Sequence, residues 1–525
     1  MNFPYSIYIK CIVMIVMYLK KINASSTSKL VLTAPRNETF LVYFNPTSIN
    51  SLNVHSHSSV QFNCSLLTPG LAAQGQNNTS KEQPPPKCAQ YRLLVVSSDA
   101  KVAVPSIAPR HDIDSMEGRQ RYAIMSIGAD RDHNFTIEAM HVGRVTMSVA
   151  LLNMDHNLMD VQRSHLVQAV SVTVKRERRL ADLVFDSSSA AVAILISFGI
   201  GCVTDMDSLK KQLKYPVSLV IGFCCQFILI PVVAFGLAMI LPVDKDVRFG
   251  LLCVACVPGG GFGHVSIVIG GADVPLSLTM NMISIVAMLG TAPLWIFVLG
   301  QYFQRGMEEK AARIIPIYNF EIWLASTFFA YTLGLVVNRF KPIVADAILM
   351  WLIKPLLLLA TILFITLGVY INMYVFEMID NYTLLGAILL PLCGCGTGFI
   401  LSVACRQKVR FIKSIALESS SFNCLIVLAA LRFSLPQPDA DLASSIPMWV
   451  MFTMPGLYIC LAILQKIKSW IDNFIESRRE KQCLDYSVVS GVINPTGIAA
   501  LSVPLFVTDG SDEEENRPNE KVTVL

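Results

Sequence analysis

The chain has 525 residues, of which 53% are hydrophobic and 15% charged, and its mean hydropathy is +0.53. A soluble globular protein is about one quarter charged, so this chain has too few charges to cover its surface in water. The net charge of +4 is small, and no basic patch with interleaved aromatic residues occurs, which argues against a nucleic-acid partner. The apolar excess lies within residues 190–467, which predicts a polytopic membrane protein behind a polar N-terminal domain.

Residues 1–24 have the pattern of a secretory signal peptide. Lys10 precedes the apolar run 11–19, which is too short to cross about 30 Å of hydrocarbon, and small residues near Ala24 suit cleavage. An uncleaved signal anchor is the alternative. We therefore expect residues 25–180 to form an extracellular or lumenal domain.

Residues 25–180 carry the features of such a domain. Alternating apolar and polar residues separated by polar turns, as in 40–44, 91–96, 145–149 and 170–174, predict an antiparallel β-sandwich. Cys64 and Cys88 are its only cysteines, and in an oxidising compartment such a pair predicts one disulfide. The acceptor sequons for glycosylation lie at Asn37, Asn63, Asn77, Asn78 and Asn134.

A basic run, Lys175-Arg-Glu-Arg-Arg179, ends this domain. We interpret it as a solvated linker close to lipid headgroups. Its Arg-x-Arg-Arg spacing also fits a site for a secretory-pathway protease, so shedding of the domain stays open.

Nine apolar segments then predict an all-α transmembrane domain over residues 188–468, with about nine membrane helices. Lys and Arg are concentrated in the alternate loops that would be cytosolic, which places the N-terminus outside and the C-terminus inside. We expect the plasma membrane, with a Golgi or endosomal membrane as the alternative. The segments lie near 188–204, 215–241, 248–270, 275–302, 317–338, 355–373, 382–404, 413–434 and 443–466.

An internal repeat relates the two halves of this domain. Ile228-Leu-Ile-Pro231 matches Ile388-Leu-Leu-Pro391, and Thr291-Ala-Pro293 matches Thr453-Met-Pro455, about 160 residues apart. Pro258-Gly-Gly-Gly-Phe-Gly263 pairs with Glu418-Ser-Ser-Ser-Phe-Asn423 at the same spacing. Each pair is five segments apart, and an odd number of crossings inverts the copy. Inverted repeats with paired broken helices are typical of secondary transporters.

The two expected helix breaks carry the candidate site. Gly259, Gly260 and Gly261 free the backbone of the third segment, while Glu418 and Ser419 bring a carboxylate and a hydroxyl into the eighth. An ionisable group inside a membrane helix is costly and is by default a functional hypothesis. His264 lies in the partner break; it is either a hydrogen-bonded structural histidine or one half of a His–Glu pair.

These residues resemble the sodium/bile acid cotransporter family, solute carrier family 10, over about Ala190 to Lys468. The resemblance rests on Cys256-Val-Pro-Gly-Gly260, Gly271-Ala-Asp-Val-Pro-Leu-Ser277 with Leu289-Gly-Thr-Ala-Pro-Leu294, and Ala416-Leu-Glu-Ser-Ser-Ser-Phe-Asn423. It implies a core with two crossing broken helices, a smaller panel domain, amphipathic organic anions such as bile acids or steroid sulfates as substrates, and sodium as coupling ion. The large N-terminal domain resembles that of one branch of the family.

The resemblance also implies part of a sodium-ligand set. Gln226, Ser277, Glu418 and Asn423 match ligand positions of the family, and Asn281 stands where the family has a threonine. Gly263-His264 replaces Ser-Asn, and Phe422 replaces a glutamine, so both sodium sites are weakened.

Three interpretations follow. The first is a symporter-like transporter of organic anions with altered coupling, to one cation or to a proton through His264 and Glu418. The second is sodium coupling through a remodelled site. The third is a non-transporting relative that acts as a receptor or binding protein through its N-terminal domain. We expect no enzyme and no resident cofactor: Gly394-Cys-Gly-Thr-Gly398 resembles a dinucleotide loop but lies in an apolar span without a βαβ pattern.

Residues 469–525 are expected to be a largely disordered cytosolic tail. Tyr486-Ser-Val-Val489 has the form of a sorting signal, and Thr523-Val-Leu525 has the form of a PDZ-domain ligand.

Overall fold

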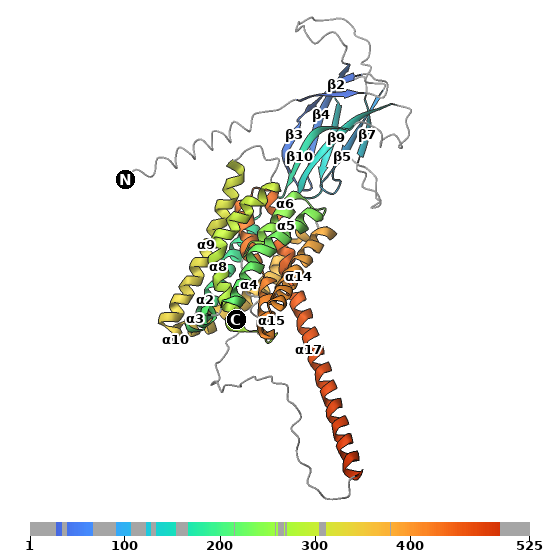
Figure 1. Ribbon diagram of the computed structural model, residues 1–525. Helices are drawn as coiled ribbons and strands as arrows, with labels where there is room; N and C mark the ends of the chain where they lie inside the picture. The colour runs from blue at the N-terminus through green and yellow to red at the C-terminus, as the bar shows by residue number, and fades with distance from the viewer. Residues whose placement is uncertain are drawn as a thin grey trace, which may run out of the picture. The chain divides into compact units, whose positions relative to one another are not determined.

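A computed structural model describes residues 28–33, 39–66, 91–106, 122–127, 133–153, 166–214, 216–257, 259–260, 267, 270–303, 311–377 and 380–493. The chain divides into two compact units, Met1–Arg179 with Pro436–Leu442, and Leu180–Leu435 with Ala443–Leu525. Figure 1 draws both units.

The first unit contains a β-sandwich, as predicted. One sheet has the strand order β1-β2-β4-β8-β6 and the other has β3-β10-β9-β5-β7. Inward-facing side chains of both sheets, among them Phe44, Phe62 and Met147, share one buried core. The neighbours pair antiparallel except β3 and β10, which run parallel. The strands are β1 (Ser28–Thr33), β2 (Thr39–Asn45), β3 (Ser48–Asn53), β4 (His57–Leu66), β5 (Tyr91–Ser97), β6 (Ala103–Ser106), β7 (Tyr122–Ser126), β8 (His133–Ala139), β9 (Gly143–Asn153) and β10 (Val167–Lys175).

The modification sites predicted for this unit are only partly described. Asn134 is exposed on β8, and Asn63 lies on β4. Cys64 on β4 is disulfide-bonded, and its pairing with Cys88 stays a prediction. The signal peptide, Asn37, Asn77, Asn78 and Cys88 lie outside the described residues.

The second unit is a helical membrane bundle. Within the described residues, eight helices are long and apolar enough to cross a bilayer. The third expected segment, 248–270, is not among them: its described helix, α6, has 11 residues and ends at Ala255, and residues 258, 261–266 and 268–269 lie outside the described residues. The crossing elements are α2 (Leu180–Val203), α4 (Val217–Cys224) with η3 (Cys225–Leu229) and α5 (Ile230–Ile240), α8 (Val274–Val298) with η4 (Gly300–Tyr302), α9 (Ala311–Phe340), α10 (Pro342–Ile348) through η5 (Leu349–Ile353), α11 (Lys354–Leu363), η6 (Phe364–Gly368) and α12 (Val369–Ile371), α14 (Asn381–Ala404), α15 (Val409–Ser419) with α16 (Cys424–Ser434), and α17 (Asp439–Ile493). Shorter helices are α3 (Met206–Lys214), α6 (Lys245–Ala255) and α13 (Met373–Glu377).

Glycines set the closest helix contacts. A Cβ on Gly201 of α2 would collide with the Tyr331 carbonyl oxygen of α9, and a Cβ on Gly334 would collide with that of Phe198. Gly394 and Gly398, one turn apart on α14, approach the backbone of α15 in the same way. Gly394 and Gly398 therefore form a small-residue packing face, and the Gly-x-Gly-x-Gly run lies within a helix, not in a dinucleotide loop.

The two halves of the repeat satisfy the carbonyl opposite their matching prolines in the same way. Pro231 cannot donate to the Phe227 carbonyl four residues earlier, and Trp295 Nε1 of α8 donates to that oxygen at 2.7 Å. Pro391 likewise has no N–H to donate to the Ala387 carbonyl, and Thr453 Oγ1 of α17 donates to that oxygen at 3.1 Å. In both halves, the helix that carries the matching Thr-x-Pro sequence supplies the missing donor.

The predicted tail is wrong at its beginning. The expectation placed a disordered segment from Ser469, but α17 continues as one helix to Ile493, and Figure 1 shows it running on past the other helices of this unit. No Gly or Pro interrupts residues 457–490, so helix propensity persists after the apolar span ends. Trp470 stacks on Phe474, and the Arg478 guanidinium lies 5.0 Å from the centroid of the Phe474 ring. Residues 494–525, with the PDZ-type sequence, lie outside the described residues.

Candidate functional site

The ends of α6 and α15 meet at the two predicted breaks. A Cβ on Gly259 would collide with Glu418 Oε1 and would lie 2.9 Å from Ser421 Oγ. A Cβ on Gly260 would lie 2.7 Å from the Phe422 carbonyl oxygen. The backbone of the first break therefore lies directly on the second, and only glycine permits this approach.

The polarity of the helices makes this place favourable for a cation. The place where the two breaks meet, around Gly259, Gly260 and Glu418, is called the crossing. The helices α6 and α15, each of 11 residues, both end there, so their C-terminal carbonyls face it. A helix C-terminus carries about half a unit of negative charge. The helix α16 starts on the other side of the break with the opposite polarity, and the Asn423 side chain caps it by accepting from the Ile426 N–H.

Glu418 is the fully buried carboxylate of the crossing. Ser277 Oγ of α8 donates to Glu418 Oε2 at 2.8 Å. The start of α8 is itself fixed on α15, because Ser414 Oγ donates to the Asp273 carbonyl and Lys413 Nζ donates to that of Gly270. These contacts position the predicted site residues Ser277 and Glu418 against each other.

Gln226 is held at the other side of the crossing by an irregular helix. It lies in η3, a π-helical turn, a local irregularity that is frequent at functional sites. Gln226 Nε2 donates to the Val257 carbonyl at 3.1 Å, just beyond the end of α6. Gln226 Oε1 is buried and accepts no hydrogen bond within the described part of the chain. A buried amide oxygen with no protein donor is a candidate cation ligand.

The remaining predicted residues are placed as follows. Asn281 is buried one turn beyond Ser277 on the same face of α8. Ser419 is buried at the end of α15, directly after Glu418. Asn423 acts as the cap of α16, a role that the sequence did not suggest. His264 and Gly261 lie outside the described residues.

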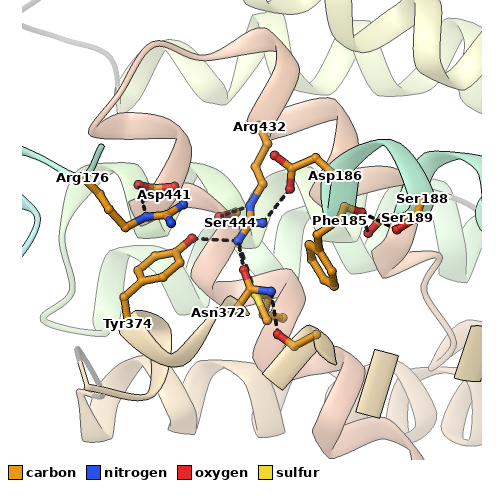
Figure 2. A network of polar contacts seen from close by, with 12 residues as sticks. Arg176, Phe185, Asp186, Ser188, Ser189, Asn372, Tyr374, Arg432, Asp441 and Ser444 are labelled. Atoms are coloured by element: carbon orange, nitrogen blue, oxygen red, sulfur yellow. Dashed lines mark hydrogen bonds and ion pairs between the residues drawn. The ribbon is translucent and has the colours of Figure 1, made fainter. Parts of the chain in front are cut away.

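The sequence reasoning missed a second buried polar cluster. Arg432 of α16 is buried and pairs with Asp186 of α2, as Figure 2 shows. Arg432 is a charged residue inside an apolar span, so the cost of burying charge in a membrane was the available signal. Asp186 escaped notice because the first segment was expected to begin at residue 188, whereas α2 begins at Leu180.

Among the described residues, the crossing brings together oxygen atoms of the kind that hard cations prefer as ligands. A carboxylate, an amide oxygen, a hydroxyl and helix-terminal carbonyls converge there. Among the described residues there is no group of three or more His, Cys, Asp or Glu side chains that could hold a metal ion. The oxygen donors of the described residues fit an alkali cation better than a transition metal, which prefers imidazole or thiolate ligands.

Comparisons with known proteins agree with this arrangement. Residues 190–319 match the model of the Sodium Bile acid symporter family. The chain is 25% identical to Sodium/bile acid cotransporter 4 of Mus musculus over 246 residues, which are 47% of this chain and 56% of that protein. It is 27% identical to the P3 protein of Mus musculus over 269 residues, 51% of this chain and 56% of that protein. It is 27% identical to the Sodium-dependent organic anion transporter of Bos taurus over 255 residues, 48% of this chain and 66% of that protein.

The fold and the crossing define a polytopic membrane protein with an N-terminal β domain. Its membrane domain is similar to the sodium/bile acid symporter family over residues 190–319, which confirms the resemblance predicted from the sequence motifs. The relatives that are named for an activity are transporters, in keeping with the expectation that the chain is not an enzyme. The chain spans little more than half the length of the first two relatives named here.

Proposed function

We propose that the protein is a secondary transporter of amphipathic organic anions, such as bile acids or steroid sulfates, which alternates access around the crossing of α6 with α15 and α16. The observation that carries the proposal is the contact of Gly259 with Glu418, which puts a buried carboxylate where the ends of α6 and α15 meet. Secondary transporters with inverted repeats bind their substrates and ions at such a place.

The coupling ion in this proposal is a cation bound by oxygens at the crossing. Glu418, Gln226, Ser277, Asn281 and the nearby carbonyls supply candidate ligands for sodium. The Phe422 side chain contributes no oxygen, but its carbonyl faces Gly260, so the backbone can replace part of what the side chain lacks. Coupling is therefore altered in this proposal: one sodium ion, or a proton carried by Glu418 with His264, in place of two sodium ions.

The proposal includes a topology. Residues 1–24 are a cleaved signal peptide, residues 25–180 are extracellular with a Cys64–Cys88 disulfide and N-glycans, and the C-terminus is cytosolic in the plasma membrane. Lys413, near the start of α15, and Lys210 and Lys211 on α3 support this orientation because cytosolic loops are rich in Lys and Arg.

Uptake of labelled taurocholate and of a sulfated steroid tests the proposal. Cells that express the chain are compared with and without external sodium, and at two values of external pH. We expect accumulation that depends on sodium or becomes steeper at acid pH, and that disappears in Glu418→Gln, which removes the charge and keeps the shape.

Surface expression of both proteins is the control, because a variant that does not reach the surface also fails to transport. Absence of flux under every gradient from a protein present at the surface contradicts the proposal. Tight binding of an anion or protein by the N-terminal domain in that case would favour a receptor.

A further inference from the structure

Among the described residues, a second buried polar cluster outside the crossing surrounds the side chain of Arg432. Its Nη1 lies 2.6 Å from Asp186 Oδ1, and its Nη2 donates to Asn372 Oδ1 and to Tyr374 Oη, each at 2.7 Å. Nε donates to Ser444 Oγ at 3.2 Å. These five residues, which Figure 2 shows converging on one guanidinium, are called the Arg432 network below.

The network joins elements that are far apart in the sequence. Asp186 lies in the second turn of α2, Asn372 and Tyr374 lie between η6 and the end of α13, and Ser444 lies near the start of α17. Arg432 itself lies in the last turn of α16. One side chain therefore fixes the end of α16 to three other segments.

The helix α16 connects this network to the crossing. It has 11 residues, about 16 Å at 1.5 Å per residue, with Asn423 of the second break at one end and Arg432 near the other. All of its residues from Cys424 to Arg432 except Leu425 are buried. A short, regular, packed helix moves as a rigid rod, so a shift of the crossing relative to α2 must either move Arg432 or break its contacts.

Breaking the Arg432–Asp186 pair is a discrete event. A buried guanidinium has no water to replace Asp186, so intermediate positions with the pair half separated are unfavourable. The α2 side of the contact is also fixed, because Gly201 and Gly334 hold α2 tightly against α9. We therefore expect the pair either to stay closed, as in this structure, or to open fully once Arg432 finds other partners.

We propose that Arg432 is a positioning residue of the transport cycle, which holds α16 against α2 at the membrane face where α2 begins and must be released before the crossing opens to that face. This inference rests on the proposed function, since it concerns the alternation of access. In this structure the network is closed, so the state described is the one that is shut toward that face.

A labelling experiment on each membrane face tests the inference. The full chain is prepared in two separate sets of sealed vesicles, one right-side-out and one inside-out. The reporter is Cys424, the first residue of α16, which is buried beside the second break. A membrane-impermeant maleimide is added to one face at a time, and the rate of Cys424 alkylation is read from peptide masses. The assay needs no substrate, so it gives a result even if the proposed cargo is wrong.

The main variant replaces the ion pair by apolar groups of similar size, Asp186→Leu with Arg432→Met, because such exchanges often preserve folding whereas removal of one partner leaves a buried charge. Asp186→Asn, which keeps the shape and one acceptor oxygen, is the second variant. Ser188→Ala is the matched control on α2, since its hydroxyl only donates to the Phe185 carbonyl of its own helix.

We expect the paired variant to raise Cys424 alkylation from the face where α2 begins by about tenfold and to lower it from the opposite face, because the populations of the two states shift. Asp186→Asn should shift both rates in the same directions by less, and Ser188→Ala should match the parent chain. Unchanged rates in a folded paired variant, or an equal rise from both faces, would overturn the inference. If the parent chain fails to take up the organic anions but the variants still shift the labelling rates, the proposed cargo is rejected and the role of Arg432 stands.

Discussion

Trp295 of α8 donates its indole N–H to the Phe227 carbonyl at 2.7 Å, the oxygen that Pro231 leaves without its helical donor. Thr453 does the same for Ala387 in the other half of the repeat. Both contacts satisfy a buried acceptor in surroundings where water is scarce. Each half of the repeat therefore tolerates its proline through a neighbouring helix.

Removal of these donors should destabilise the bundle. We expect Trp295→Phe and Thr453→Val each to lower the free energy of unfolding by about 1–3 kcal/mol, since a buried carbonyl loses its partner. Thermal unfolding in detergent measures this. Thr361→Val is the control, because the Thr361 hydroxyl is exposed and donates only to the Leu357 carbonyl of its own helix. Equal melting of all three variants would show that the proline carbonyls find other donors.

The glycines of α14 provide an internally controlled test of packing. Gly394→Ala and Gly398→Ala should each cost about 1–3 kcal/mol of stability, because a Cβ would overlap the backbone of α15. Gly396→Ala, between them on the same helix, has nothing within 4 Å of the added Cβ and should be neutral or slightly stabilising. The measurement is the same thermal unfolding, and a loss at Gly396 as large as at its neighbours would argue against this helix contact.

Gly259→Ala should stop transport even if the chain folds. The added methyl group would displace the Glu418 carboxylate, and a misplacement of about 1 Å at a functional group can lower a rate about 100-fold. Uptake normalised to surface protein is the measurement. Gly290→Ala on α8, where an added Cβ meets nothing within 4 Å, should transport like the parent chain. Normal uptake by Gly259→Ala would mean that the approach of the two breaks is not required.

Gln226→Leu should reveal whether its buried oxygen binds the coupling cation. We expect the sodium concentration for half-maximal uptake to rise about tenfold, with a smaller change in the KM for the anion, because one oxygen ligand is lost. Ser402→Ala is the control, since its buried hydroxyl donates only to the Gly398 carbonyl one turn away. A change confined to the KM for the anion would place Gln226 in the substrate site instead.

Much of the architecture could be predicted because it depends on local patterns. Alternation in stretches such as 91–96 and 170–174 matched β5 and β10, and apolar segments of sufficient length matched the spanning helices. The repeat brought the glycines and Glu418 into one hypothesis, and the structure places Gly259 on Glu418. Matching positions of the two repeats predicted this contact because both copies have the same order of helices.

Contacts between residues that are distant in the sequence could not be predicted from those local patterns. Nothing local connects Arg432 with Asp186, which are separated by 246 residues, and nothing indicated that Asn423 would cap α16. The π turn around Gln226 and the continuation of α17 to Ile493 depend on neighbouring helices and on an absence of helix breakers, respectively. A segment can be charged and polar and still stay helical, which composition alone does not reveal.

The most direct test of the central claim uses the purified full chain in sealed lipid vesicles with an imposed sodium gradient and a radiolabelled sulfated steroid outside. We predict accumulation of the steroid above its equilibrium level in vesicles with the parent chain, and none with Glu418→Gln, because the buried carboxylate at the crossing binds the coupling cation. Equal accumulation by the two proteins, with matched reconstitution, would contradict the assignment of Glu418 as the centre of transport.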